Sequence, residues 1–335
     1  MLMTSRFRIV RAGAAALVLV TLIGAPRRAG ANGARPLGMG GAFIAIADDE
    51  NAMYNNVAGL SQIDRSLTQV SVQVNERENF HRDSATFVSK FFTSTDKERV
   101  TLEEYLESDY TFKSEVQEVA NYTWGVSFLS EKRSLELNRL SGFNSATDDK
   151  KRTYQLAFST RFPVLEKLTR RPELYAGIRG RYSDINREIP ALMVKAGQDV
   201  YDLDFHLFYR ANSRLNVGFA ANSLISGSTD DVVGARDFSA SYDLGFSYTY
   251  GERRDTIIAA DFTNMFNASR SKDPRIRLGV ERQFLDNDFA VRIGANDGLL
   301  TLGFGLRFWE DFRLDYAFVN GRVLDEHQVS ARFNF

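Results

Sequence analysis

The chain has 335 residues and a formal net charge of −1, with 44% hydrophobic, 25% charged and 12% aromatic side chains. It contains no cysteine and only three scattered histidines, which excludes disulfides, iron–sulfur clusters and thiolate zinc sites and gives little support to a histidine metal site. The balanced charge argues against nucleic acid as a partner, and the mean hydropathy of −0.28 argues against a helical membrane protein, so we expect a β-rich protein without cofactor or metal.

Residues 1–31 have the pattern of a secretory signal peptide. Three arginines lie near the start, an apolar run follows over 12–25, and positions 29–31 read AGA. The run is shorter than the roughly 20 residues that a membrane-spanning helix needs, and the small residues after it suit a signal peptidase. We therefore predict cleavage after Ala31 and export from the cytoplasm. A short uncleaved anchor is the alternative.

The segment 32–65 carries a motif unlike the rest of the chain. Residues 35–50 read RPLGMGGAFIAIADDE, and residues 52–60 read AMYNNVAGL. This resembles the start of the FadL-like outer-membrane superfamily, most closely its PorV/PorQ branch, which opens A-R-x-x-G-M-G-G-A-F-x-A-x-A-D-D and continues with a tyrosine and N-P-A-G-L. Val57 stands where the family has proline. The resemblance implies a barrel whose lumen holds this segment as a plug. The plug motif residues are Gly38, Met39, Gly40, Gly41, Asp48, Asp49, Asn56, Ala58 and Gly59.

The residue types of this motif suit a chain packed against a barrel wall. Its glycines permit close backbone approach and positive φ. They do not form a phosphate-binding loop, because Phe43 occupies the position of the third glycine and no Lys-Ser/Thr pair follows. A cation site is one interpretation of the acidic run 48–50. Pairing with lumenal arginines, or capping of a helix, is the favoured one.

From residue 66 onward, segments of roughly ten residues alternate between apolar and polar side chains. Over 301–308, one parity reads Leu-Phe-Leu-Phe and the other reads Thr-Gly-Gly-Arg. Soluble β-sandwiches and transmembrane barrels both give such alternation. Segment lengths that suit a tilted membrane strand, aromatic residues at segment ends and a final strand ending in Phe335 favour the barrel.

The C-terminal Phe335 resembles the signal by which the barrel assembly machinery recognises bacterial outer-membrane proteins. We therefore predict an all-β fold: a transmembrane antiparallel β-barrel over 66–335, located in the bacterial outer membrane, with an N-terminal lumenal plug. Its expected partners are outer-membrane lipid and the assembly machinery.

The strand count follows from a periplasmic C-terminus. Short turns then fall on the periplasmic side, and longer links fall on the extracellular side at 188–198, 224–237 and 264–274. About fourteen strands remain when 135–139 is assigned to an extracellular loop between residues 129 and 151. The connection 93–115, with a short helix begun by a capping box, is then periplasmic, although the opposite choice would place it outside. The tight turn at 296–298 is expected outside.

The inward parity of the strands carries charges of both signs. The residues we single out are Arg179, Arg181, Arg277, Arg292, Arg307, Arg313, Asp243, Glu281 and Asp315. Because buried charges must be paired, an ion-pair network that holds the plug is favoured over an electropositive pathway for anions or fatty carboxylates. No enzyme is expected, since His206 has no evident catalytic partner in the sequence.

Three functions remain open at the level of sequence. The first is a transport barrel for hydrophobic or amphipathic small molecules, with the apolar segment 189–194 as a capture surface. The second is a PorV-like accessory barrel that docks or shuttles secreted proteins of a type IX-like secretion system. The third is a mainly structural barrel. The plug motif favours the PorV/PorQ branch, but a motif alone does not transfer an activity.

Overall fold

The computed structural model describes residues 33–63, 65–75, 80–91, 122–138, 144–162, 173–189, 194–229, 240–266, 274–320 and 325–335. The predicted signal peptide, the connection 93–115 and residues 190–193 of the predicted capture surface lie outside these ranges. Within them, no helix has the length and hydropathy needed to cross a membrane.

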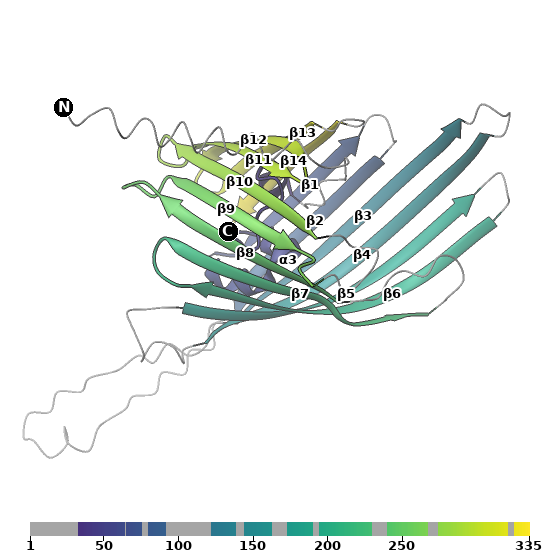
Figure 1. The fold of residues 1–335 in the computed structure, drawn as a ribbon, viewed down its shortest axis with the longest axis horizontal. Helices are drawn as coiled ribbons and strands as arrows, with labels where there is room; N and C mark the ends of the chain where they lie inside the picture. Colours follow the sequence, from purple (N-terminus) through teal and green to yellow (C-terminus); the bar gives the residue numbers. More distant parts are fainter. Residues whose placement is uncertain are drawn as a thin grey trace, which may run out of the picture.

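Fourteen antiparallel strands form one closed barrel, as predicted (Figure 1). The strands are β1 Leu67–Asn75, β2 Phe80–Phe91, β3 Tyr122–Asn138, β4 Asn144–Phe162, β5 Glu173–Ile189, β6 Val194–Arg210, β7 Leu215–Ser228, β8 Ser241–Tyr250, β9 Thr256–Thr263, β10 Arg275–Phe284, β11 Phe289–Asn296, β12 Leu299–Trp309, β13 Phe312–Asn320 and β14 Glu326–Asn334. Each strand pairs with its sequence neighbours, and β1 closes the ring against β14 in the register Leu67 to Asn334. Because β1 pairs with β14, none of the fourteen described strands is an unpaired edge strand.

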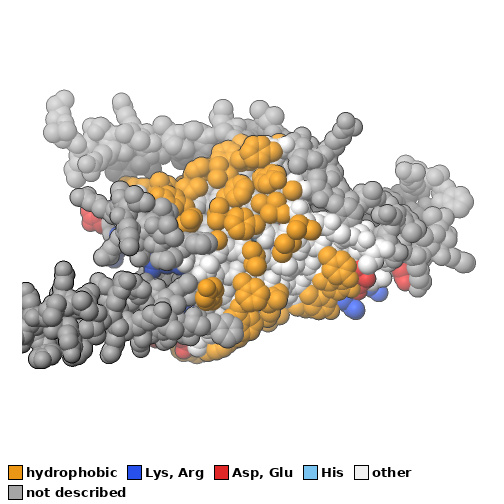
Figure 2. Space-filling model, turned by 90° about the horizontal axis from the view of Figure 1, so that it is seen from below, with side chains coloured by type: hydrophobic (Ala, Val, Ile, Leu, Met, Phe, Trp, Pro, Cys, Tyr) orange, Lys and Arg blue, Asp and Glu red, His pale blue; other side chains and the backbone are white. Residues whose placement is uncertain are grey.

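The wall places its apolar parity outside. On β12, Leu302, Phe304 and Leu306 are exposed, whereas Gly303 and Gly305 between them are buried. Hydrophobic side chains form a band across the outer face (Figure 2). A water-soluble barrel would place these side chains in its core, so the alternation has the polarity of a barrel surrounded by lipid.

Aromatic side chains border the band at both ends. Toward the end that carries the C-terminus, the rings of Phe308, Trp309, Phe312 and Phe333 contact one another. The other border is a ladder across four strands, composed of Phe128, Tyr154, Tyr182 and Tyr201, with ring centroids 5.2–6.0 Å apart. Such borders correspond to the interfacial girdles of membrane barrels.

The predicted extracellular loop between residues 129 and 151 is wrong. β3 continues to Asn138 and β4 begins at Asn144, with Leu135 opposite Thr147, so the segment 135–139 lies largely in a strand. The strand count survives because this segment extends a strand rather than adding one. The extension was missed because it carries only two alternating apolar residues, Leu135 and Leu137, among polar ones.

The same correction applies to the next two links. β5 runs to Ile189 and β6 starts at Val194, so the predicted loop 188–198 is mostly strand, and β7 reaches Ser228 inside the predicted loop 224–237. The strands β3 to β6 have 17–19 residues, against 8–11 in β8 to β13. One side of the wall therefore extends well past the other (Figure 1).

The segment 33–63 lies inside the barrel. It forms the helices α2 (Ala34–Gly38) and α3 (Ala52–Asn55) and the 3₁₀ helix η2 (Val57–Gln62), which are enclosed by the strands (Figure 1). α2 packs on β11 to β14, and η2 packs on β3 to β6, so the two ends of the segment contact opposite parts of the wall. We call residues 33–63 the plug.

Candidate functional site

The plug approaches the wall at backbone distance through glycines. A Cβ on Gly38 would lie 2.9 Å from Cα of Gly303, and one on Gly40, whose φ is +66°, would lie 2.6 Å from the backbone of Ala295. Glycines on the inward parity of the wall provide most of the space, and their recurrence there is the signal in the sequence that marks this contact. The wall glycines closest to the plug are Gly125, Gly177, Gly218, Gly245, Gly279, Gly294 and Gly303.

The other glycines of the motif shape the plug itself. Gly41 has a φ of +79°, which only glycine adopts without strain. Gly59 packs on Ala47 within the plug, where a Cβ would lie 2.1 Å from the Ala47 carbonyl oxygen. Met39 is fully buried, and its carbonyl oxygen lies 2.4 Å from where a Cβ on Gly279 would stand. The motif therefore fixes both the turns of the plug and its depth against the wall.

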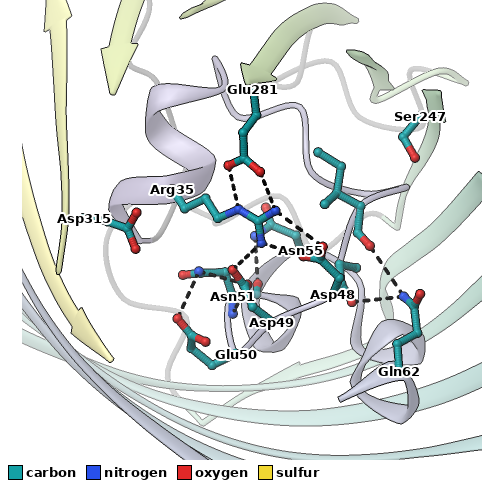
Figure 3. Close-up of polar contacts among 12 residues, drawn as sticks. Arg35, Asp48, Asp49, Glu50, Asn51, Asn55, Gln62, Ser247, Glu281 and Asp315 are labelled. Carbon is teal, nitrogen blue, oxygen red and sulfur yellow. Dashed lines mark hydrogen bonds and ion pairs between the residues drawn. The ribbon is translucent and has the colours of Figure 1, made fainter. Parts of the chain in front are cut away.

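Arg35 fastens the plug to the wall (Figure 3). Its Nε and Nη2 donate to the two carboxylate oxygens of Glu281, on β10, at 2.9 Å each. Its Nη1 donates to Asp48 at 2.6 Å and to Asp49 at 2.7 Å. Paired, two-point hydrogen bonds of this kind are the strongest that arginine makes with a carboxylate. Sequence reasoning missed Arg35, although it is the sole basic residue between positions 33 and 63.

A second layer of charges surrounds this contact. Arg292 Nε donates to Glu281 at 2.5 Å, and Arg292 Nη1 lies 2.7 Å from Asp315. Arg313 Nε donates to the same Asp315 at 3.2 Å. All four side chains are buried and come from β10, β11 and β13. Four of the predicted lumenal charges therefore lie together beside α2.

The acid Glu50 has a different environment. It is fully buried, and its Oε2 lies 3.6 Å from Nη1 of Arg332 on β14. Burial, together with the nearby Asp49 carboxylate, raises the pKa of Glu50 to about 8, against the opposing effect of Arg332. The raised pKa favours the protonated form of Glu50 over the range in which an ordinary glutamate is ionised.

Two further predicted charges, Arg179 and Arg181, lie across the lumen on β5, beside Asp204 of β6, which sequence reasoning did not single out. Arg179 Nε donates to Asp204 at 2.7 Å, and its Nη1 donates to the carbonyl oxygen of Met53 in the plug at 2.6 Å. Arg181 Nη2 donates to Asp204 at 2.9 Å. The plug is thus held through two buried arginines, its own Arg35 and Arg179 of the wall, which binds the plug at Met53.

His206 has partners that the sequence did not reveal. Its Nδ1 accepts from the N–H of Val57 at 2.9 Å, and its Nε2 lies 3.2 Å from Oδ1 of Asn222. Asn222 also donates to Asp243, another of the predicted charges. These contacts surround a bulge of β7, where Ser223 has a φ of +55° and the register against β6 shifts. The histidine therefore positions plug and wall and is not arranged as a catalytic base.

The acid Asp261 is another residue that sequence reasoning missed. Its Oδ2 accepts from the N–H groups of Phe43 at 2.7 Å and Ile44 at 3.0 Å, so a wall carboxylate binds the turn in the middle of the plug. Its inward position on an otherwise apolar strand was the available signal.

The Asn-x-Ala-Gly-Leu part of the motif has a clear local role. The Asn56 side chain accepts from the N–H of Ala58 at 3.2 Å and so caps η2. Its amide donates to the carbonyl oxygens of Ile44 and Leu207, both at 2.9 Å. Asn56 therefore joins two plug segments to β6.

The last two predicted lumenal charges lie in different places. Arg277 lies directly opposite Asp261 in the register of β9 and β10 and donates from Nη1 to the carbonyl oxygen of Gly41 at 3.4 Å. Arg307 lies at the barrel end, where it pairs with Asp288 at 2.7 Å and contacts the carbonyl oxygen of Asp286 in an exposed turn. Its assignment to the lumenal network is wrong, because the inward parity of β12 reaches the rim at this residue.

A polar cavity of about 420 Å³ lies beside the plug, at the barrel end that carries the C-terminus. The plug contributes Asp48 and Gln62, and the wall contributes Arg210 and Glu173 among others. Asp48 has a side chain 41% exposed, although it pairs with Arg35. The cavity therefore reaches the same ion pairs that fasten the plug. In the described part of the chain, no group of three histidine or acidic side chains could hold a metal ion.

Comparison with known proteins places the fold. No protein-family model and no curated protein matches the chain. The CymD monoaromatic hydrocarbon channel has a TM-score of 0.57 at 13% identity, over 92% of this chain and 98% of its own. The toluene transporter TodX of Pseudomonas putida has a TM-score of 0.58 at 12% identity, and the match covers 91% of this chain and 97% of TodX. A FadL homologue of Pseudomonas aeruginosa has a TM-score of 0.55 at 13% identity, and the match covers 93% of this chain and 100% of the homologue. The chain therefore has the fold of FadL-like barrels.

Proposed function

We propose that this protein is an outer-membrane barrel that transports hydrophobic or amphipathic small molecules. The observation that carries the proposal is the buried plug, which fills the lumen and is held by Arg35 and Arg179. A fourteen-stranded lumen is too wide for side chains alone to fill. Because the plug occupies this lumen and is held by polar contacts, a solute can cross the barrel only when the plug is displaced. The fold shared with a hydrocarbon channel and a toluene transporter supports this substrate class.

The outer-membrane location rests on the wall. An apolar band between two aromatic borders and an even number of antiparallel strands are typical of bacterial outer-membrane barrels. The described turns at the end that carries the C-terminus are short, for example 285–288 and 310–311. We assign that end to the periplasm, and the long strands β3 to β6 then extend outward from the cell.

A second candidate function is a PorV-like accessory barrel for secreted proteins. It is favoured by the plug motif, which resembles the PorV/PorQ branch. The extension of β3 to β6 past the aromatic ladder adds a surface on which a protein partner can dock. The two functions make different demands on the lumen, since only transport requires a solute to pass the plug.

Uptake by cells that carry the protein tests the transport function. We expect faster uptake of a monoaromatic hydrocarbon or a long-chain fatty acid than in cells without it, and no faster uptake of a hydrophilic sugar. Deletion of residues 36–49 should leave an assembled barrel, recognised by heat-modifiable migration, that also admits the sugar and raises single-channel conductance.

The outcomes separate the two candidates. Unchanged uptake of every solute, together with a secreted protein that copurifies with the barrel, would contradict transport and support the accessory function. Unchanged conductance in the assembled deletion variant would contradict the plug as the closing element. Recovery of the protein outside the outer-membrane fraction would contradict both.

A further inference from the structure

We propose that Lys132, Lys150 and Arg152, on the outer face of β3 and β4, form a binding site for the phosphates of a glycolipid in the outer leaflet of the membrane. This inference rests on the outer-membrane location proposed above. It adds a lipid site on the wall, separate from the lumen and its solute.

The three cations lie side by side on the lipid-facing parity. Lys132 is directly opposite Lys150 in the register of β3 and β4, and Arg152 follows Lys150 on the same face. All three side chains are exposed, while Lys151 between the two β4 cations lies on the other parity. Directly opposite residues have Cβ atoms about 5 Å apart, so one group with several phosphate oxygens can reach all three.

None of the three cations forms an ion pair in the part of the chain that the structure describes, although such pairs are common elsewhere in the wall. Asp184, directly opposite Arg152, accepts a hydrogen bond from Asn186 at 2.6 Å, and the nearby Asp83 pairs with His81 at 2.8 Å. Like charges directly opposite in a sheet are destabilising. A bound anion would remove this repulsion.

The position of the three cations relative to the apolar band indicates that the bound phosphate belongs to a lipid. Phe128 and Tyr154, two rungs of the aromatic ladder, lie on the same strands and the same face. Arg152 is two residues beyond Tyr154, which is about 7 Å along the strand, and Lys150 is about 13 Å beyond it. Below the ladder, Leu156 and Phe158 are 45% and 46% exposed and face the acyl region.

An amphiphile fits this sequence of apolar band, aromatic ladder and cations along the wall. Acyl chains can lie on the apolar band while phosphates at the head meet the cations just above the aromatic border. Arginine and lysine both bind phosphate, the former through two parallel hydrogen bonds. On the extracellular side of a bacterial outer membrane, the phosphate-bearing amphiphile is the lipid A part of lipopolysaccharide.

The test uses the folded full-length mature protein in zwitterionic micelles, with added diphosphorylated lipid A as the probe. Native mass spectrometry measures the bound fraction. The variant carries Lys132→Gln, Lys150→Gln and Arg152→Gln together. The charge-matched control carries Arg214→Gln, Arg253→Gln and Arg282→Gln, three exposed positions near the other end of the barrel. Heat-modifiable migration verifies that both variants are folded.

We expect the variant to bind lipid A at least tenfold more weakly than the wild type, and the control to bind like the wild type. Removal of both phosphates from lipid A should lower wild-type binding to the level of the variant. Inorganic phosphate at the same concentration should not compete.

Equal binding by wild type and variant, equal loss in the control, or full binding of the dephosphorylated lipid would each overturn the inference. Competition by inorganic phosphate would overturn the assignment to a lipid. Solute uptake is measured separately: its absence in wild-type cells contradicts the proposed transport and leaves the lipid result intact, whereas a loss of lipid binding with normal uptake contradicts only the lipid site.

Discussion

The backbone N–H of Val57 donates to Nδ1 of His206 at 2.9 Å, and both residues are fully buried. Val57 is also the position at which the plug motif departs from the PorV/PorQ pattern that it resembles, where proline is usual. Proline has no N–H, so the departure supplies the donor that a buried histidine on β6 accepts from. Val57 and His206 are 149 residues apart in sequence. The motif alone therefore could not explain why valine replaces proline.

The first prediction concerns this pair. Val57→Pro should lower the free energy of unfolding by about 1–3 kcal/mol, because Nδ1 of His206 loses its donor in a buried place. The proline itself should fit, since Asn56 before it is already extended (φ −153°, ψ 97°). Urea unfolding in micelles measures the cost. In a His206→Ala background the same substitution should cost almost nothing, and an equal cost in both backgrounds would show that the hydrogen bond is not responsible.

A second prediction concerns the attachment of the plug. Arg35→Met should destabilise the plugged state by about 3–5 kcal/mol, because Glu281, Asp48 and Asp49 lose their shared partner. Single-channel recording should show longer or more frequent openings. The matched control is Arg307→Met, which removes an exposed rim pair and should cost less than about 1 kcal/mol. Similar effects of the two substitutions would contradict the role of Arg35.

The third prediction is a pH dependence that Glu50 contributes. Its pKa of about 8 in the folded protein is above the ordinary value near 4.5, so the native state binds more protons than the unfolded chain between these pH values. Stability should therefore fall as pH rises from about 4.5 to 8, by at most about 1.4 kcal/mol per pH unit. Urea midpoints between pH 5 and 9 measure this slope. Glu50→Gln should reduce this slope, and an unchanged slope would contradict the raised pKa of Glu50.

A fourth prediction tests the close approach of plug and wall. Gly294→Ala would place a Cβ 2.2 Å from N of Gly40 and 2.3 Å from the backbone carbon of Met39, so the plug must shift. We expect conductance to rise while the barrel still assembles. Gly180→Ala is the control, because a Cβ there meets nothing within 4 Å. Normal conductance in the Gly294 variant would mean that the plug adapts without opening the lumen.

The fifth prediction addresses the lipid-facing wall. Phe304→Arg should cost roughly 2–4 kcal/mol, because Phe304 lies in the outward apolar band. Gly227→Arg, on β7 directly opposite Tyr201 of the aromatic ladder, where an added Cβ meets no atom within 4 Å, should change stability by less than about 1 kcal/mol, the cost expected at a membrane interface. Refolding into lipid vesicles at increasing urea measures both. Equal tolerance at the two positions would contradict the membrane band.

The sequence was sufficient for the barrel because an apolar parity facing lipid leaves a period of two in every strand, as on β12. The strand ends were harder to predict, because the extensions of β3 to β6 are rich in polar residues and resemble loops in sequence. The plug was located through a local motif. Its attachments were not predicted, because contacts such as Arg35 to Glu281 join residues 246 positions apart and depend on a register that alternation alone does not set.

The plug also constrains the order of assembly. Its first described helix, α2, is bound by the last strand of the wall: Ala34 N donates to Ser330 Oγ on β14 at 2.9 Å, 296 residues later. Translation therefore releases this segment long before its partner exists, and contacts of such sequence separation are slow to form. A nascent chain stalled before β14 has an open seam beside β1 and an unanchored N-terminus. Sealing of the seam and seating of the plug should thus occur in one late step.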